Sequence, residues 1–120
     1  MNVHITGIAL GIAIGLVDCS LFAATGMPIT APLAVEAVVF WAAVGWAIHT
    51  VPVKLPGIVK GVAISWFLNI PWILEYAVVQ GQAEIFMPMA VLGTLFGAVA
   101  GLVSAYLKRR SGAAAAGRTA

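Results

Sequence analysis

The chain has 120 residues, of which 62% are hydrophobic and 8% are charged. Soluble domains are about 25% charged, so this composition, with a mean hydropathy of +1.08, argues against a soluble fold and for a small integral membrane protein. The formal net charge of +2 does not indicate nucleic-acid binding, because the basic residues gather where a membrane topology would place them.

In chain order, four apolar windows are long enough to cross a hydrocarbon core of ~30 Å at ~1.5 Å per residue. They cover residues 5–24, 29–49, 57–79 and 85–107. We therefore predict an all-α fold, a single four-helix transmembrane bundle over residues 1–110, in which short connections make successive helices antiparallel neighbours. The small and polar residues 111–120 are expected to form a disordered cytoplasmic tail.

The first and fourth windows each carry a glycine at every fourth position. Such stripes let another helix backbone approach closely. At ~100° per residue, Asp18 continues the first stripe and Ser104 continues the second. The stripes predict helix packing, either against each other or with one stripe against a second protomer. The six glycines are Gly7, Gly11, Gly15, Gly93, Gly97 and Gly101.

The third window contains a proline inside an otherwise helical pattern. Pro71 removes a backbone donor and clashes with the preceding turn, so a kink is expected. Asn69 lies just before it. Carbonyls freed by a kink need partners or must line a cavity. We interpret Asn69 and Pro71 as a candidate gate, with simple shaping of the bundle as the alternative.

Two groups of basic residues predict the orientation. Lys54 and Lys60 flank the connection between the second and third windows, and Lys108–Arg110 follows the fourth. The other two connections contain no Lys or Arg. The positive-inside rule then places both termini and the middle connection in the cytoplasm. We expect a bacterial inner membrane as the location.

Three of the windows each carry one acid, namely Asp18, Glu36 and Glu75. Counting from the outer connections places all three roughly 6–10 Å into the outer leaflet. Ionisable groups inside a membrane usually mark functional sites, and no Lys or Arg is expected at this depth. Protonation, a wet cavity or a bound cation would resolve the charges, so we predict an outer cation-binding layer. The alternative is that Glu36 and Glu75 are interfacial residues that reach headgroup water.

Sulfur and aromatic side chains add weaker hints. Cys19, Met87 and Met89 are expected on the outer side, where soft ligands would suit Cu(I), although packing is the plainer interpretation. No resident cofactor is expected beyond a bound cation. Trp41 and Trp72 lie deeper than an aromatic belt requires. A buried tryptophan beside Glu36 or Glu75 would offer a cation–π wall for an organic cation, with a packing role as the plainer interpretation.

The sequence contains no nucleophile–base pair and no phosphate-binding loop, so we do not expect an enzyme. Asp18, with the other two acids, favours a small cation transporter or channel. A chain this short would build a transport path from two or more protomers, with the glycine stripes as candidate seams. The alternative is a non-catalytic accessory subunit that packs into a larger membrane complex through its glycine faces.

Overall fold

The computed structural model describes residues 2–26 and 28–119. Within these ranges every regular element is a helix, and the helices are joined by short connections. The elements are α1 (Val3–Ala24), α2 (Ala31–Thr50), α3 (Gly57–Ile73), the π-helix η1 (Leu74–Val79), the short 3-10 helix η2 (Ala83–Ile85) and α4 (Phe86–Thr119). Four of the described helical segments are long and apolar enough to cross a membrane. The prediction of an all-helical chain with four helices able to span a membrane is confirmed at this level.

Capping residues account for the starts of α1 and α2. The side chain of Asn2 accepts a hydrogen bond of 2.9 Å from the backbone nitrogen of His4 at the start of α1. Thr30 does the same for Leu33 at the start of α2, where Pro32 occupies the first turn. Such caps satisfy backbone donors that have no partner within the helix. The connections that follow are short, so each helix has its successor within reach.

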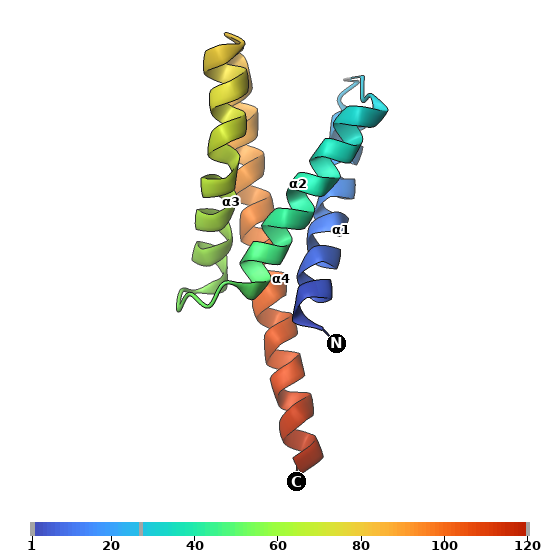
Figure 1. Ribbon diagram of the computed structural model, residues 1–120, viewed down its shortest axis with the longest axis vertical. Helices are drawn as coiled ribbons and strands as arrows, with labels where there is room; N and C mark the ends of the chain where they lie inside the picture. The colour runs from blue at the N-terminus through green and yellow to red at the C-terminus, as the bar shows by residue number, and fades with distance from the viewer. Residues whose placement is uncertain (1, 27, 120) are drawn as a thin grey trace.

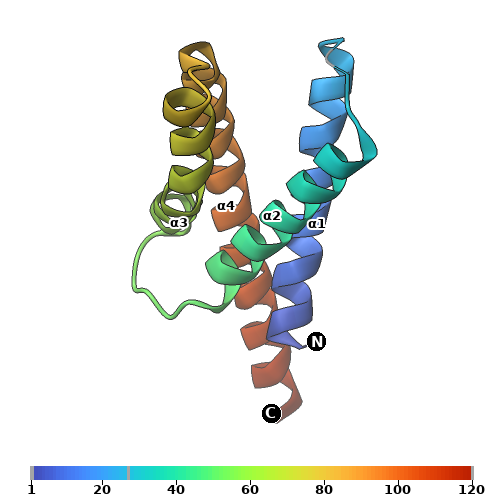
Figure 2. The same cartoon turned by 45° about the horizontal axis from the view of Figure 1, so that its top comes forward.

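The four helices form two pairs (Figure 1). α1 packs mainly against α2, and α3 packs mainly against α4, whereas contacts between the pairs are few. We call α1 with α2 the N-terminal pair, and α3 and η1 with α4 the C-terminal pair. The pairs separate toward the end that carries η2 and the start of α2, which we call the divergent end (Figures 1 and 2). α1 begins and α4 ends at the opposite end.

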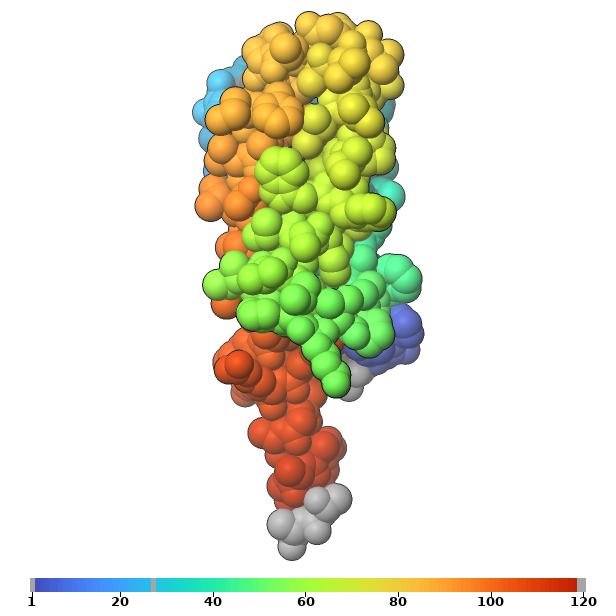
Figure 3. Space-filling view, turned by 90° about the vertical axis from the view of Figure 1, so that its left-hand side faces the viewer, coloured from blue at the N-terminus to red at the C-terminus, as the bar shows by residue number. Residues whose placement is uncertain are grey.

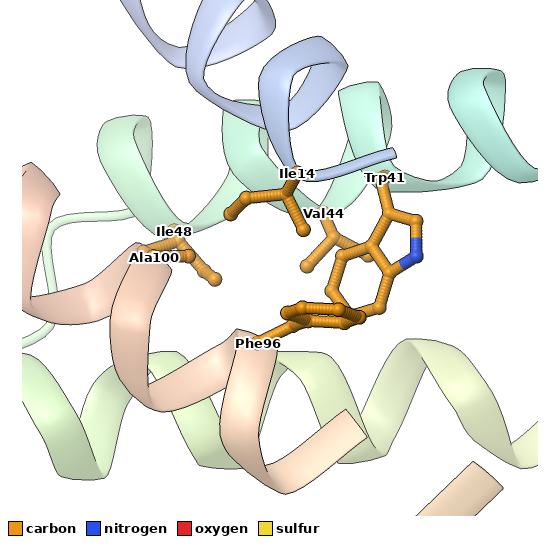
Figure 4. Close-up of a cluster of buried hydrophobic side chains, with 6 residues drawn as sticks. All are labelled: Ile14, Trp41, Val44, Ile48, Phe96 and Ala100. Carbon is orange, nitrogen blue, oxygen red and sulfur yellow. The ribbon is translucent and has the colours of Figure 1, made fainter. Parts of the chain in front are cut away.

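A small apolar core joins the two pairs away from the divergent end (Figure 4). The Trp41 and Phe96 rings meet edge to face, with centroids 5.3 Å apart. Edge-to-face contacts of this kind are favourable beyond the area they bury. Because these rings come from α2 and α4, they hold the N-terminal pair to the C-terminal pair. The full cluster is Ile14, Trp41, Val44, Ile48, Phe96 and Ala100.

Each glycine stripe is covered by the partner helix of its own pair. A Cβ added at Gly7 would lie 2.9 Å from the Trp46 Cα atom, and one at Gly97 would lie 2.7 Å from the Ser65 Cβ atom. The structure therefore differs from both expected arrangements, α1 against α4 or one stripe against a second protomer. The reason is that each partner helix offers its own small residues to the stripe, such as Gly45 in α2.

The Pro71 interruption takes the form of a change in helix type. α3 continues through Pro71 to Ile73 and then widens into η1. The backbone nitrogen of Gln80 donates to the Glu75 carbonyl, five residues earlier, at 2.9 Å. A proline removes one backbone donor from the regular ladder, and π-helical turns inside membrane and soluble helices often occur at functional sites.

The end of the chain differs from the expected disordered tail. α4 continues to Thr119 and has 34 residues, which corresponds to ~51 Å at ~1.5 Å per residue. Its last part extends beyond the other helices as a narrow projection (Figure 3). The physical reason is local, since residues 113–116 are all alanine, the strongest helix former. Residue 120 lies outside the described residues.

Large apolar side chains cover the outward faces of the helices. Phe67 and Val79 are each 72% exposed, and Val35 and Val39 are each 62% exposed. A protein in water rarely leaves so much apolar surface uncovered. In a bilayer these side chains would contact lipid, which agrees with the four candidate membrane spans.

Candidate functional site

A cavity of about 310 Å³ lies between the two helix pairs at the divergent end. Both pairs contribute to it, because the core holds them together at one end and they separate at the other. Most of its lining is apolar or aromatic. The lining also includes three side chains with carboxyl or amide groups, and these are Asp18, Glu36 and Asn69.

Asp18 is the most buried acid of the cavity wall. Its side chain is 8% exposed, and its Oδ2 atom accepts a hydrogen bond of 2.9 Å from the Trp41 indole nitrogen. Its Oδ1 atom is buried and has no hydrogen-bond partner among the described residues. A buried carboxylate is costly unless its charge and its lone pairs are satisfied. No Lys or Arg lines the cavity, so Asp18 lacks a counter-charge there.

Trp41 is the partner of Asp18 that sequence reasoning missed. The glycine stripe allows α2 to lie directly on α1, since a Cβ at Gly15 would be 3.3 Å from the Trp41 Cβ atom. In Figure 4 the indole nitrogen points away from Phe96 and the apolar core. A buried indole N–H usually finds an acceptor. That requirement, applied to a tryptophan predicted deep in the membrane, was the signal available in the sequence.

Asn69 borders the same cavity from α3. It is 7% exposed, and its amide group makes no hydrogen bond with any other described residue. Gly93 of α4 leaves room for the amide, because a Cβ at Gly93 would lie 2.9 Å from the Asn69 Nδ2 atom. The residue predicted as part of a gate therefore lies in the cavity wall with unused hydrogen-bonding capacity.

The three predicted acids do not share one environment. Glu36 is exposed and borders the cavity that Asp18 lines. Glu75 is also exposed, but it is not part of the cavity wall, and its Oε1 atom accepts a hydrogen bond of 3.2 Å from Gln80. The cavity-lining positions of this segment are Trp72 and Tyr76. The structure thus brings two of the three acids together and leaves Glu75 outside.

A continuous series of aromatic rings runs from the core along the cavity. Phe40 meets Trp41 with centroids 5.4 Å apart and Trp72 with centroids 6.3 Å apart, both edge to face. Trp72 stacks on Tyr76 at 6.1 Å, with an interplanar angle of 18°. These four rings come from both pairs and all line the cavity. The acid and the amide are therefore set in a largely aromatic wall.

The three sulfur atoms considered as soft ligands lie in different surroundings. Met89 lines the cavity. Met87 is 63% exposed, and the Cys19 thiol donates to the Ala34 carbonyl oxygen over 3.8 Å, between α1 and α2. Within residues 2–26 and 28–119, no three His, Cys, Asp or Glu side chains are grouped so as to hold a metal ion. The geometry gives no single sulfur site.

The opposite end of the molecule holds a polar contact between the pairs. His49 is 4% exposed and its Nδ1 atom lies 2.9 Å from the Ser104 hydroxyl. Lys60 is also buried and donates to the Val51 carbonyl oxygen. Ser104 is the residue that continues the second glycine stripe. These contacts link α2 to α4 and hold the connection between α2 and α3.

Comparison of the chain with models of protein families, with characterised proteins and with solved structures gives no match.

Proposed function

We propose that this is an integral membrane protein that binds a cation at Asp18 and carries it across the bilayer, with the cavity as its entrance. One observation carries the proposal. Asp18 is a buried acid on the cavity wall, its Oδ1 atom has no partner among the described residues, and no basic side chain lines the cavity. A cation would supply both the missing charge and the missing contact.

The proposed topology has four antiparallel crossings with both termini in the cytoplasm of a bacterium. Lys54 and Lys108–Arg110 lie away from the divergent end, and the positive-inside rule assigns such residues to the cytoplasmic side. The divergent end, which carries Glu84, then faces outward. To test this, a cysteine is introduced in a Cys19→Ala background and labelled with a membrane-impermeant maleimide on whole cells. Glu84→Cys should react and Ser111→Cys should not; the reverse pattern would contradict the topology.

The surrounding groups support uptake from the divergent end. Glu36 is exposed at the cavity and would attract a cation before it reaches Asp18. Asn69 supplies an amide oxygen, and the widened segment η1 follows it on the same helix. Irregular backbone at membrane depth is tolerated where it lines a cavity or lies within protein. We propose that movement of this segment opens and closes the path.

Cation flux into proteoliposomes tests the proposal. The purified protein is reconstituted, and the uptake of protons and of monovalent and divalent metal ions, and the release of preloaded organic amines, are followed. Asp18→Asn should lower the flux by at least about tenfold, because the buried charge that binds the cation is removed. Glu84→Gln removes the same charge at the same end without touching the cavity wall, and it should leave flux unchanged. Equal flux in the two variants would contradict the proposal.

The position of the glycines supports a transporter over an accessory subunit that docks through glycine faces. Both stripes are covered inside the chain by their partner helices. A partner protein, or a second copy in the predicted homo-oligomer, would have to bind through the outward apolar faces instead. Co-purification from native membranes separates the two functions: a stoichiometric foreign partner, with no flux by the isolated protein, would favour the accessory subunit.

A further inference from the structure

We propose that the cation is an organic ammonium ion with an apolar, preferably aromatic, body. The inference rests on the proposed cation-binding function and adds the chemical class of the ligand. It depends on three features of the cavity, which are its free polar atoms, its ring-lined walls and its size.

The free polar atoms suit a head group that donates hydrogen bonds. Trp41 already occupies the Oδ2 atom of Asp18, and the Oδ1 atom is buried with no partner among the described residues, so Oδ1 would become the acceptor when the Asp18 side chain turns toward the cavity. The amide oxygen of Asn69 is a second acceptor without a partner among the described residues. A primary ammonium group has three N–H donors, and charge-assisted hydrogen bonds to a carboxylate are the strong ones. Two acceptors on opposite helix pairs match such a head group.

A hard metal ion would find a poorer set of ligands. Ca²⁺ takes about six to eight oxygen ligands, and Mg²⁺ takes a full octahedron. The cavity wall offers the carboxylates of Asp18 and Glu36 and the amide of Asn69, and one carboxylate oxygen is already engaged. Most of the remaining wall is carbon, which neither ion can use.

The aromatic walls suit the rest of such a ligand. Phe40, Trp72 and Tyr76 line the cavity and contact one another in sequence. A cation within about 6 Å of an aromatic face is attracted by the ring quadrupole, most strongly by tryptophan. The same faces bury apolar groups of a ligand. The wall therefore favours a molecule that carries its charge at one end and rings or methylene groups at the other.

The size of the cavity agrees with this class. Its volume of about 310 Å³ lies at the lower end of the roughly 300–1,000 Å³ typical of small-molecule pockets. A water molecule in the liquid occupies about 30 Å³, so the cavity has roughly ten times the volume of one water molecule. A compact ring with a short aminoalkyl chain would fill it.

The test is calorimetric binding to the protein in nanodiscs of zwitterionic lipid. The probes are 2-phenylethylammonium chloride, its neutral counterpart 2-phenylethanol, sodium chloride and calcium chloride; empty nanodiscs correct for partitioning. We expect saturable binding of the ammonium probe only. Asp18→Asn should weaken that binding by about 30-fold or more, as for the loss of one partner of a buried charge pair. Glu84→Gln is the matched control and should bind as the unmodified protein does.

A second pair of variants tests the aromatic wall. Trp72→Leu and Phe40→Leu should each weaken binding of the ammonium probe by about 3- to 10-fold. Phe67→Leu, at a position 72% exposed on the outer face, should have no effect. Circular dichroism checks that each variant keeps its helices, and the Phe40 and Trp72 variants serve as replacements for each other should one fail to fold.

The outcomes separate this inference from the proposed function. Equal binding of 2-phenylethanol, or unchanged binding in Asp18→Asn, would overturn the ammonium ligand. Binding of sodium or calcium that depends on Asp18, without binding of the ammonium probe, would overturn the ligand class and leave the cation site standing. No binding of any probe to the folded protein would count against both.

Discussion

Both helix pairs pack through a stripe of small residues, but the polar residue that follows the stripe differs between them. In α1, Gly7, Gly11 and Gly15 face the partner helix, and the next turn carries Asp18. In α3, Gly57, Gly61 and Ser65 face the partner helix, and the next turn carries Asn69. Both polar residues are buried at the same cavity. Close packing requires small residues in both pairs. It does not constrain the charge of the polar residue that follows them, which is an acid at Asp18 and a neutral amide at Asn69.

The partner helices also differ, and this explains the asymmetry of the site. α4 presents a full glycine stripe to α3, so the backbones meet directly. α2 presents Gly45 but also Trp41, whose ring reaches both Asp18 and Phe96. The N-terminal pair therefore supplies a charge with its hydrogen-bond donor, and the C-terminal pair supplies a neutral amide without one. We infer that the cation's charge is met from one side of the cavity only.

The largest expected effect is a loss of stability when a glycine is replaced in the stripes of small residues through which both pairs pack. A Cβ at Gly11 would lie 2.6 Å from the Ala42 Cα atom, and one at Gly61 would lie 2.9 Å from the Gly101 Cα atom. Because backbone must shift in both cases, Gly11→Ala and Gly61→Ala should each lower the free energy of unfolding by about 2 kcal/mol or more. Unfolding in mixed detergent micelles measures this.

Gly112→Ala is the matched control, since no atom lies within 4 Å of a Cβ added there. In the helix of α4 it should leave stability unchanged or raise it by up to about 1 kcal/mol. If the alanines at positions 11 and 61 cost no more than the one at position 112, the close approach in the two pairs is not a source of stability.

The next largest effect is expected when the carboxylate is moved from the N-terminal pair to the C-terminal pair. Asp18→Asn should abolish most cation binding, and adding Asn69→Asp should restore it to within about tenfold, because the carboxylate returns to the same cavity from the other wall. Asp18→Asn with Gln82→Asp places the new acid outside the cavity wall and should restore nothing. Binding is measured by calorimetry in nanodiscs. Equal recovery in both double variants would mean that surface charge at the divergent end, rather than the cavity, governs binding.

The smallest expected effect distinguishes Glu36 from Glu75. Glu36, in the N-terminal pair, borders the cavity, and Glu75, in the C-terminal pair, does not. Glu36→Gln should slow cation association by about threefold at low salt, with the difference disappearing as salt rises. Glu75→Gln should leave the rate unchanged. Stopped-flow tryptophan fluorescence gives both rates, and a larger effect at Glu75 would show that η1 faces the path.

Much of the fold could be predicted from the sequence because hydropathy acts locally. Window length placed the starts of all four long helices, and the ends of the first three when η1 is counted with α3, within a few residues of those observed. The helical tail was missed because its small residues were read as a sign of disorder, whereas the alanines at 113–116 favour helix. Asp18 and Asn69 could be singled out because polar groups are costly at membrane depth.

Other features depend on which helices meet, and this is not encoded in any one window. Successive helices were expected to be neighbours, but a glycine stripe indicates how closely a neighbour can approach and not which neighbour it is, so the packing of the α1 stripe against α2 and of the α4 stripe against α3 was not foreseen. The Trp41–Asp18 hydrogen bond follows from that pairing. Glu75 was expected at the cavity by depth alone, but depth does not fix the rotation of a helix that changes to π geometry after Pro71.

Infrared difference spectroscopy of the carboxyl groups tests the central claim most directly. Spectra of the protein in nanodiscs are recorded before and after addition of 2-phenylethylammonium chloride. The account predicts a change in one carboxyl absorption that is lost in Asp18→Asn and kept in Glu84→Gln. A spectrum that does not respond, or that responds equally in Asp18→Asn, would contradict a cation site at Asp18.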